Sequence, residues 1–163
     1  MTKKINWPLT IAAGLAGGLI GGLVKLGWEN ILPPRTPERN KTNPPQQLLQ
    51  QLGVPEKITH ATYTYSGQKL PYVSYLIHFG FSCGFGIAYS VGSQLVPWIK
   101  KGHGIPAGLV IWDVFHLELL PKLGTIPSIK DQPMEEHISE ALGHAIWMWS
   151  IDEIIRGVES QEN

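Results

Sequence analysis

Two long stretches without acidic or basic side chains constrain this chain more than any other feature of its sequence. Residues 6–24 carry no charge, and residues 70–99 contain no acidic or basic residue except His78. The second stretch is 30 residues long, whereas about 20 apolar residues are enough to cross a bilayer. Because the buried helices of soluble proteins rarely run so far without a charge, the sequence favours integration into a membrane.

The bulk composition limits the remaining classes of function. The chain has 163 residues, which suits a single domain over 1–163, and its 13 basic side chains balance its 13 acidic ones. This balance gives no electrostatic footprint for a nucleic acid, so we expect no nucleic-acid partner. The single cysteine, Cys83, excludes an internal disulfide and any multi-cysteine metal site.

Four segments are predicted to form membrane-spanning helices. The first two cover about 7–28 and 71–97 and are almost free of charge. The other two, about 104–123 and 136–155, contain carboxylates and histidines, which a span tolerates only where they face the bundle interior or a wet cavity. We therefore expect an all-α integral membrane bundle of about four transmembrane helices, with an outer loop at about 30–70.

The basic residues near the span ends predict the orientation of the bundle. Lys3 and Lys4 followed by an apolar run resemble a secretory signal, but no clear small-residue cleavage site follows, so we expect an uncleaved first span. Lys100, Lys101 and Arg156 lie on the same side as the first lysines if the chain crosses four times. The positive-inside rule then places both termini of this multi-pass protein on the cytoplasmic side.

Glycines in the first span are spaced for close helix packing. Residues four apart share a helix face, so the first span carries two ridges of small residues, one of Gly14, Gly18 and Gly22 and one of Gly17 and Gly21. Such ridges let a second helix backbone approach closely. Packing within one subunit is favoured about two to one over a homo-oligomer face, and both readings are structural.

Three histidines fall at one depth in three different spans. His78 lies seven residues from the expected outer end of the second span, His116 seven from that of the third and His144 eight from that of the fourth. At about 1.5 Å per residue, all three lie roughly 10–12 Å below the outer surface. Glu140 precedes His144 by four residues and shares its helix face.

This histidine layer has three readings. His78, His116, Glu140 and His144 are the expected ligands of a divalent transition metal such as zinc, because imidazole and carboxylate suit that class of ion. Alternatively, the same groups take up protons arriving from outside. The third reading is that each histidine separately bonds a neighbouring helix. Asp113, three residues before His116, is expected to share its face and to orient the imidazole.

Two motifs resemble a known family. The stretches "VKLGWENILPPRTP" (24–37) and "ISEALGHAIWMWSIDEIIR" (138–156) are similar to the YagU-like family of small bacterial inner-membrane proteins. The positions that match its pattern are Lys25, Gly27, Glu29, Pro33, Pro34, Arg35, Pro37, His78, His116, Ser139, Glu140, Gly143, His144, Trp147 and Trp149. The outer loop from Arg39 to Lys69 does not match. The resemblance implies a multi-spanning membrane protein associated, in at least one member, with acid resistance.

The resemblance draws attention to a polar outer cluster. Lys25, Glu29, Arg35 and Ser139 match the family pattern and are predicted to lie in the outer half of the membrane. Pro33 and Pro34 end the first helix abruptly, which would return Arg35 over the mouth of the bundle. A proton or metal arriving from outside would meet the protein there.

The expected function is therefore non-enzymatic. We predict a membrane protein in contact with lipid whose outward His/Glu site binds a divalent metal or protons and supports acid tolerance. The sequence carries no recognised nucleophile, phosphate-binding or zinc-protease motif. The alternatives are a metal-dependent membrane enzyme acting on a lipid or small substrate through a metal-bound water, and a structural oligomer packed on the glycine ridges.

Overall fold

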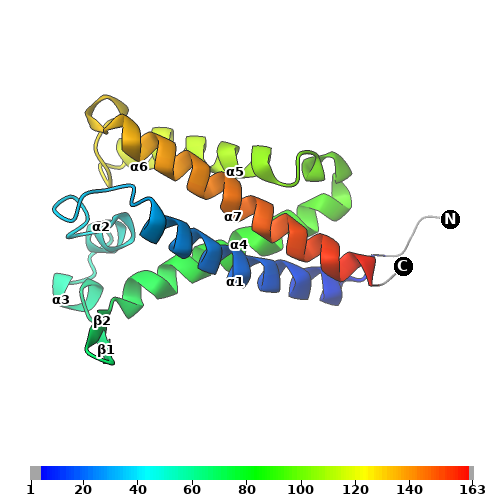
Figure 1. The fold of residues 1–163 in the computed structure, drawn as a ribbon, viewed down its shortest axis with the longest axis horizontal. Helices are drawn as coiled ribbons and strands as arrows, with labels where there is room; N and C mark the ends of the chain where they lie inside the picture. The colour runs from blue at the N-terminus through cyan, green and yellow to red at the C-terminus, as the bar shows by residue number, and fades with distance from the viewer. Residues whose placement is uncertain (1–4, 162–163) are drawn as a thin grey trace.

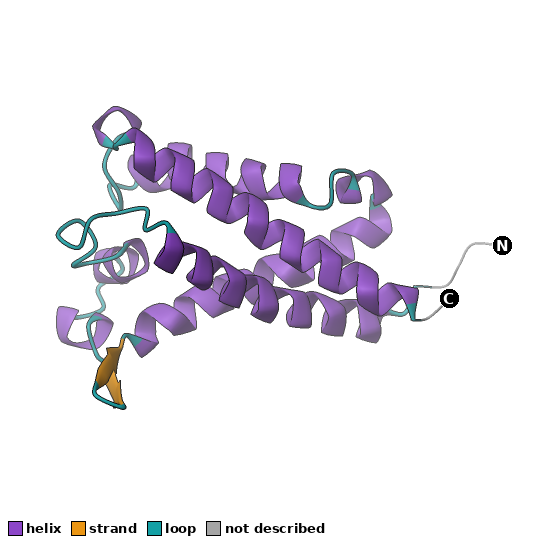
Figure 2. Ribbon diagram, in the orientation of Figure 1, coloured by secondary structure: helices purple, strands orange, loops and turns teal. Residues whose placement is uncertain are grey.

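The fold is an elongated bundle of helices, seen in a computed structural model that describes residues 5–161 (Figure 1). Four long segments form the bundle: α1 (Trp7–Ile31), α4 (Tyr72–Leu95), α7 (Met134–Ser160), and a broken third helix. This confirms the all-α prediction, since the described residues outside helices are loops and one small hairpin (Figure 2).

The third helix changes its winding along its length. It consists of α5 (Ile105–Trp112), the π-helical turn η2 (Asp113–Leu119) and α6 (Leu120–Lys122). The sequence predicted one regular helix over about 104–123. Wider π turns are rare and are found mostly as single turns at functional sites, which makes η2 a segment of interest.

Short elements cap the end of the bundle where α1 finishes and α7 starts, called here the loop end (Figure 1). They are α2 (Pro44–Gln51), α3 (Glu56–Thr59), the antiparallel strands β1 (Tyr63–Tyr65) and β2 (Gln68–Leu70), and the 3₁₀ turn η3 (Ile129–Asp131). A second 3₁₀ turn, η1 (Pro97–Lys100), connects α4 to α5 at the opposite end. Asn43 starts α2, because its side chain accepts a hydrogen bond from the Gln46 backbone N–H and the Gln46 side chain accepts one from the Asn43 backbone N–H. This capping box satisfies two otherwise free backbone donors.

The glycines of α1 lie between the two helices that flank it. A Cβ atom built on Gly14 would lie 2.6 Å from the Ile87 Cα, and one on Gly18 would lie 2.5 Å from the Cys83 Cα, both in α4. A Cβ on Gly21 would lie 2.6 Å from Ile151 Cγ1 in α7. The first ridge (Gly14, Gly18 and Gly22) therefore packs on α4 and the second (Gly17 and Gly21) packs on α7 of the same chain. Only glycine permits these approaches.

Serine hydroxyls add hydrogen bonds across these close helix contacts. Ser82 donates to the Gly18 carbonyl at 2.6 Å and accepts from the Trp147 indole at 2.7 Å. Ser90 donates to the Thr10 carbonyl at 2.8 Å. The apolar core beside them consists of Ala13, Tyr89, Trp147, Met148, Ile151 and Ile155. The centre of the bundle is therefore fixed by packing and by satisfied hydroxyls, two features that also hold helices together in membranes.

Among the described residues, α1 is the one helix that is both long and apolar enough to cross a membrane by the usual measures. Helices also occupy the other three predicted segments, and α4 and α7 are 24 and 27 residues long. Their lower apolar character comes from the serines and His78 of α4 and from the buried charges of α7. Four crossings therefore remain a prediction.

Candidate functional site

A buried carboxylate, Glu140, lies at the centre of the polar residues near the loop end. It is in the second turn of α7 and is only 4% exposed. The Lys25 ammonium of α1 lies 3.2 Å from Oε2, and the Arg35 guanidinium donates to Oε1 at 2.8 Å. A buried carboxylate requires paired partners, and these two cations come from α1 and from the loop that follows it.

A second buried carboxylate, Glu136, lies one turn earlier on α7. Arg35 Nε is 2.8 Å from its Oε1 and Arg39 Nη1 is 2.7 Å from its Oε2, while the residue itself is only 1% exposed. Arg35 therefore bridges Glu136 and Glu140. The sequence reasoning missed Glu136 and Arg39. The signal was present, because Glu136, Glu140 and His144 follow one another at intervals of four and share one face of α7.

Lys25 also pairs with Glu29 on its own helix at 2.5 Å. The group of Lys25, Glu29, Arg35, Arg39, Glu136 and Glu140, together with the adjacent His116 and His144, is called the Glu140 cluster below. Its three cations match its three carboxylates. With neutral imidazoles, the cluster carries no net charge, as expected for ionised groups removed from water.

Two of the predicted histidines contact the carboxylate of Glu140. His116 Nε2 lies 3.6 Å from Oε2 and His144 Nδ1 lies 3.7 Å from the same oxygen. Their rings meet edge to face with centroids 5.0 Å apart. One ligand atom from each of His116, Glu140 and His144 falls within 4.8 Å of the others. The structure thus brings together three of the four predicted metal ligands.

His78, the fourth predicted ligand, lies outside this group of converging atoms. Its Nε2 is 2.9 Å from the Gly22 carbonyl of α1, and since a carbonyl only accepts, the imidazole donates. The structure thus groups three of the four predicted ligands without His78, and the part of His78 in a metal site stays a prediction. Equal depth on three helices did not fix the direction in which each side chain points around its helix.

The π-helical turn η2 carries His116 and alters its surroundings. Asp113, expected to orient His116, is exposed instead, and among the described residues the buried Nδ1 of His116 has no hydrogen-bond partner. That expectation is wrong because the wider winding of η2 separates side chains that a regular helix would align. The indole Nε1 of Trp112, one residue before η2, is also buried without a partner among the described residues.

Ser139 plays a structural part beside the cluster. Its hydroxyl donates to the Leu32 carbonyl at 2.5 Å, and its own carbonyl accepts from the Trp28 indole at 3.0 Å. Both bonds tie the end of α1 to α7. They fix the chain just before Pro33 and Pro34, and so they determine where Arg35 enters the Glu140 cluster.

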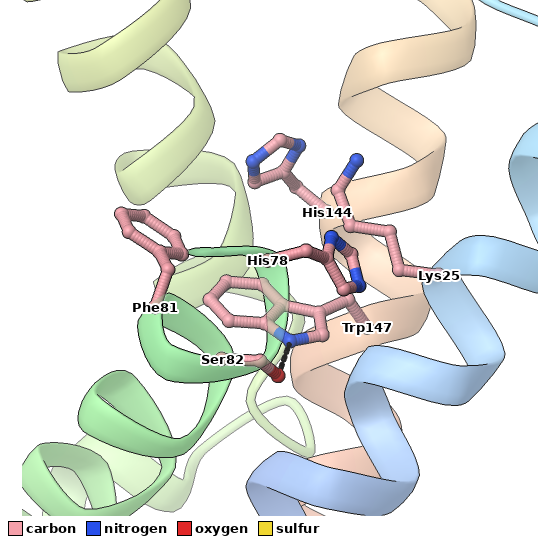
Figure 3. Close-up of a pocket in the computed structure, with 6 residues that line it drawn as sticks. All are labelled: Lys25, His78, Phe81, Ser82, His144 and Trp147. Carbon is pink, nitrogen blue, oxygen red and sulfur yellow. Dashed lines mark hydrogen bonds between the residues drawn. The ribbon is translucent and has the colours of Figure 1, made fainter. Parts of the chain in front are cut away.

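A small cavity adjoins the Glu140 cluster on the side of the bundle centre (Figure 3). Its volume is about 40 Å³. Its walls are formed by side chains from α1, α4 and α7, namely Lys25, His78, Phe81, Ser82, His144 and Trp147. His78 therefore shares a cavity with Lys25 and His144 although it makes no ion pair with them.

A separate polar group, called the Asp152 cluster, occupies the far part of α7. Asp152 is fully buried, accepts from the Tyr89 hydroxyl at 2.8 Å and pairs with Arg156 one turn later. Arg156 also donates to the Lys100 carbonyl at 2.6 Å, and the Lys100 side chain pairs with Glu159. These bonds attach η1 to the end of α7.

Comparison with known proteins gives a consistent result. Residues 19–153 match the family described as "Protein of unknown function (DUF1440)". The chain is 32% identical to "Inner membrane protein YagU" of Escherichia coli (strain K12) over 182 aligned residues, which cover 98% of this chain and 88% of that protein. No solved structure matches. The chain is therefore a membrane protein of all-α fold that belongs to the YagU-like, DUF1440 family.

Proposed function

We propose that this protein is a bacterial inner-membrane protein whose Glu140 cluster binds protons arriving from outside the cell and so supports acid tolerance. The localisation follows the name of its relative from Escherichia coli, an inner membrane protein. The proposal keeps the orientation expected from the basic residues, with the loop end outside and both termini in the cytoplasm.

One observation supports this proposal above all: two buried imidazoles lie beside a buried carboxylate that is already neutralised. Glu140 is paired with Lys25 and Arg35, and His116 and His144 lie 3.6 and 3.7 Å from its Oε2. The cluster is balanced in charge only while the imidazoles are neutral. Since histidine is the side chain that changes charge most readily near neutral pH, proton uptake would change the charge of this site.

Proton binding would act on the attachment of the loop end. A proton on either imidazole adds a positive charge beside Lys25 and Arg35, and a proton on Glu140 removes the charge that holds both of them. Because Arg35 bridges Glu140 and Glu136, the segment after α1 is the part of the chain that such a proton would release. Protonation that weakens ion pairs holding a segment is a common form of pH-dependent switch.

A divalent metal is the second candidate ligand, favoured by the convergence of His116, Glu140 and His144 atoms within 4.8 Å. Two features oppose it. Lys25 already occupies Glu140 Oε2. In addition, metal-binding histidines almost always donate their second ring nitrogen to a partner, whereas His116 Nδ1 has none among the described residues.

The remaining alternatives have less support from the geometry. A metal-dependent enzyme acting on a lipid or small substrate would need the same three ligands and an open coordination position. An oligomer assembled on the glycine ridges would need those ridges free, but they are buried against α4 and α7 of the same chain. We therefore propose neither role.

The test combines acid survival with elemental analysis. Cells lacking the native protein would receive the wild type, the double variant His116→Gln/His144→Gln, or the control His103→Gln, whose imidazole is exposed at the opposite end. At equal amounts of folded protein in the membrane, we expect only the double variant to reduce survival in acid to that of cells without the protein. Survival equal to wild type would refute proton binding at this site.

Elemental mass spectrometry of the detergent-purified protein separates the two ligands. We expect less than stoichiometric transition metal in the wild type after growth with added zinc. One metal ion per chain that disappears in His144→Ala would support the metal-binding candidate instead, and the enzyme hypothesis would then merit an activity screen.

A further inference from the structure

The cavity beside the Glu140 cluster has polar walls that the proposed function does not use. Figure 3 shows His144 and the Lys25 ammonium at the top, Phe81 and His78 on opposite sides at mid-height, and Trp147 and Ser82 below. The cavity volume of about 40 Å³ exceeds the minimum of roughly 10–15 Å³ that a cavity needs to hold one water molecule. A cavity of this size takes a water molecule only if two to four polar groups are available to bond it.

Two of these groups are imidazole nitrogens with a fixed role. His78 donates its Nε2 hydrogen to the Gly22 carbonyl at 2.9 Å, and His144 donates its Nδ1 hydrogen to the Glu140 carbonyl at 2.8 Å. A neutral imidazole has one donor and one acceptor nitrogen. His78 Nδ1 and His144 Nε2 are therefore both acceptors.

The third group is the Lys25 ammonium, which has three N–H donors. Two of them serve Glu29 at 2.5 Å and Glu140 at 3.2 Å, which leaves one for the cavity that Lys25 lines. Ser82 is different, because its hydroxyl donates to the Gly18 carbonyl and accepts from the Trp147 indole. Three residues that line the cavity, Lys25, His78 and His144, thus each keep one hydrogen-bonding group that is not used elsewhere in the described part of the chain.

We propose that this cavity is a water-binding site, in which a water molecule accepts from Lys25 and donates to His78 and His144. Those three bonds match the hydrogen-bonding capacity of one water molecule. The bound water links His78 to the Glu140 cluster without a metal ion. The water gives the half-buried His78 a hydrogen-bonded connection to the buried His144. This inference deepens the proposed function and rests on it.

Hydroxyl-radical labelling by X-ray radiolysis tests the site, because side chains beside a bound water are oxidised by the radicals formed from it. Phe81 lines the cavity, and Phe85, one turn further along α4, provides the matched control because it is equally half-buried but does not line the cavity. We expect Phe81 in the detergent-purified wild type to be oxidised several-fold faster than Phe85. Equal rates would overturn the proposal.

A variant identifies the partners of the water. His78→Leu removes an acceptor and places apolar atoms in the cavity, so the labelling of Phe81 should fall to the rate of Phe85. Leu76→Phe, at a position 69% exposed on the same helix, should leave both rates unchanged. Undiminished Phe81 labelling in a folded His78→Leu variant would overturn the role of His78. Labelling reports the water and acid survival reports the function, so each proposal can fail without the other.

Discussion

The Glu140 cluster and the Asp152 cluster are both built on α7 around a buried carboxylate and an arginine, yet they differ in what surrounds the carboxylate. Asp152 is held by Tyr89 and by Arg156 from its own helix, and Arg156 also bonds the Lys100 carbonyl. The Arg156 side chain is 37% exposed. The Tyr89 bond attaches α4 to α7, and the bond to the Lys100 carbonyl attaches η1 to α7, as expected for a structural clamp.

The Glu140 cluster instead collects groups from four segments of the chain. Lys25 comes from α1, Arg35 from the loop after it, His116 from η2 and His144 from α7. Lys25 and Arg35 are only 11% and 10% exposed, so water cannot replace Glu140 as their partner. The comparison shows that the two buried carboxylates differ in the imidazoles near them. His116 and His144 beside Glu140 are only 12% and 4% exposed, whereas His103 near Asp152 is 59% exposed.

Replacing the central carboxylate should give the largest effect. Glu140→Gln keeps the shape but leaves Lys25 and Arg35 buried without their shared counter-charge. Removing one member of a buried ion pair costs about 3–5 kcal/mol, so we expect a loss of that size in unfolding free energy, measured by denaturant titration in detergent.

A surface pair provides the control for that measurement. Glu118→Gln breaks the ion pair between Glu118 and Lys122, whose side chains are 54% and 74% exposed. Exposed pairs contribute about 0–1 kcal/mol. Equal losses for Glu140→Gln and Glu118→Gln would show that the Glu140 cluster is not buried as described, and the contrast between the two clusters would then fail.

The sequence predicted the residues of the site better than their connections. Depth along a helix follows from the rise per residue, so His78, His116 and His144 could be placed at one level, with Glu140 one turn above His144. Direction around the helix depends on contacts, which is why the bond from His78 to Gly22 was not predicted. The π-helical winding of η2, which exposes Asp113, has no known signature in a single sequence.

Long-range folding of the loop was the other part that sequence reasoning could not supply. The two prolines predicted that α1 would end and that Arg35 would return over the bundle. They did not predict that Arg39 would follow it to pair with Glu136, because that contact depends on the bonds of Ser139 to the end of α1. The glycine ridges were easier to recognise, since both the spacing and the reason for it are local.

A substitution in the first glycine ridge tests how much stability depends on the close contact between α1 and α4. In Gly18→Ala the added methyl group would lie 2.5 Å from the Cys83 Cα, so α1 and α4 must move apart. Overpacking of this kind costs about 1–3 kcal/mol. Gly27→Ala, on the same helix with no atom within 4 Å of the new Cβ, should leave stability unchanged or raise it slightly. A loss in both variants would point to impaired membrane insertion rather than to the contact between α1 and α4.

Asp152→Asn should separate the clamp from the functional site. Arg156 is exposed enough to regain water, and asparagine still accepts from Tyr89. We therefore expect a loss of about 1.5–3 kcal/mol, the range of a hydrogen bond to a charged group. Acid survival should equal that of the wild type at equal protein level. Survival reduced as far as in His116→Gln/His144→Gln would mean that the two clusters act together, and the distinction drawn between them would be wrong.

The smallest effects should come from arginines that keep their charge. Arg35→Lys retains a cation, but one ammonium cannot reproduce the two separate contacts that Nε and Nη2 make with Glu136 and Glu140. We expect a loss of about 1 kcal/mol, the value of one hydrogen bond. Arg39→Lys gives up less, because Arg39 makes a single contact with Glu136 and is 28% exposed, and its cost should stay below about 0.5 kcal/mol. A larger loss for Arg39→Lys than for Arg35→Lys would show that Glu136, rather than Glu140, is the carboxylate on which the loop end depends.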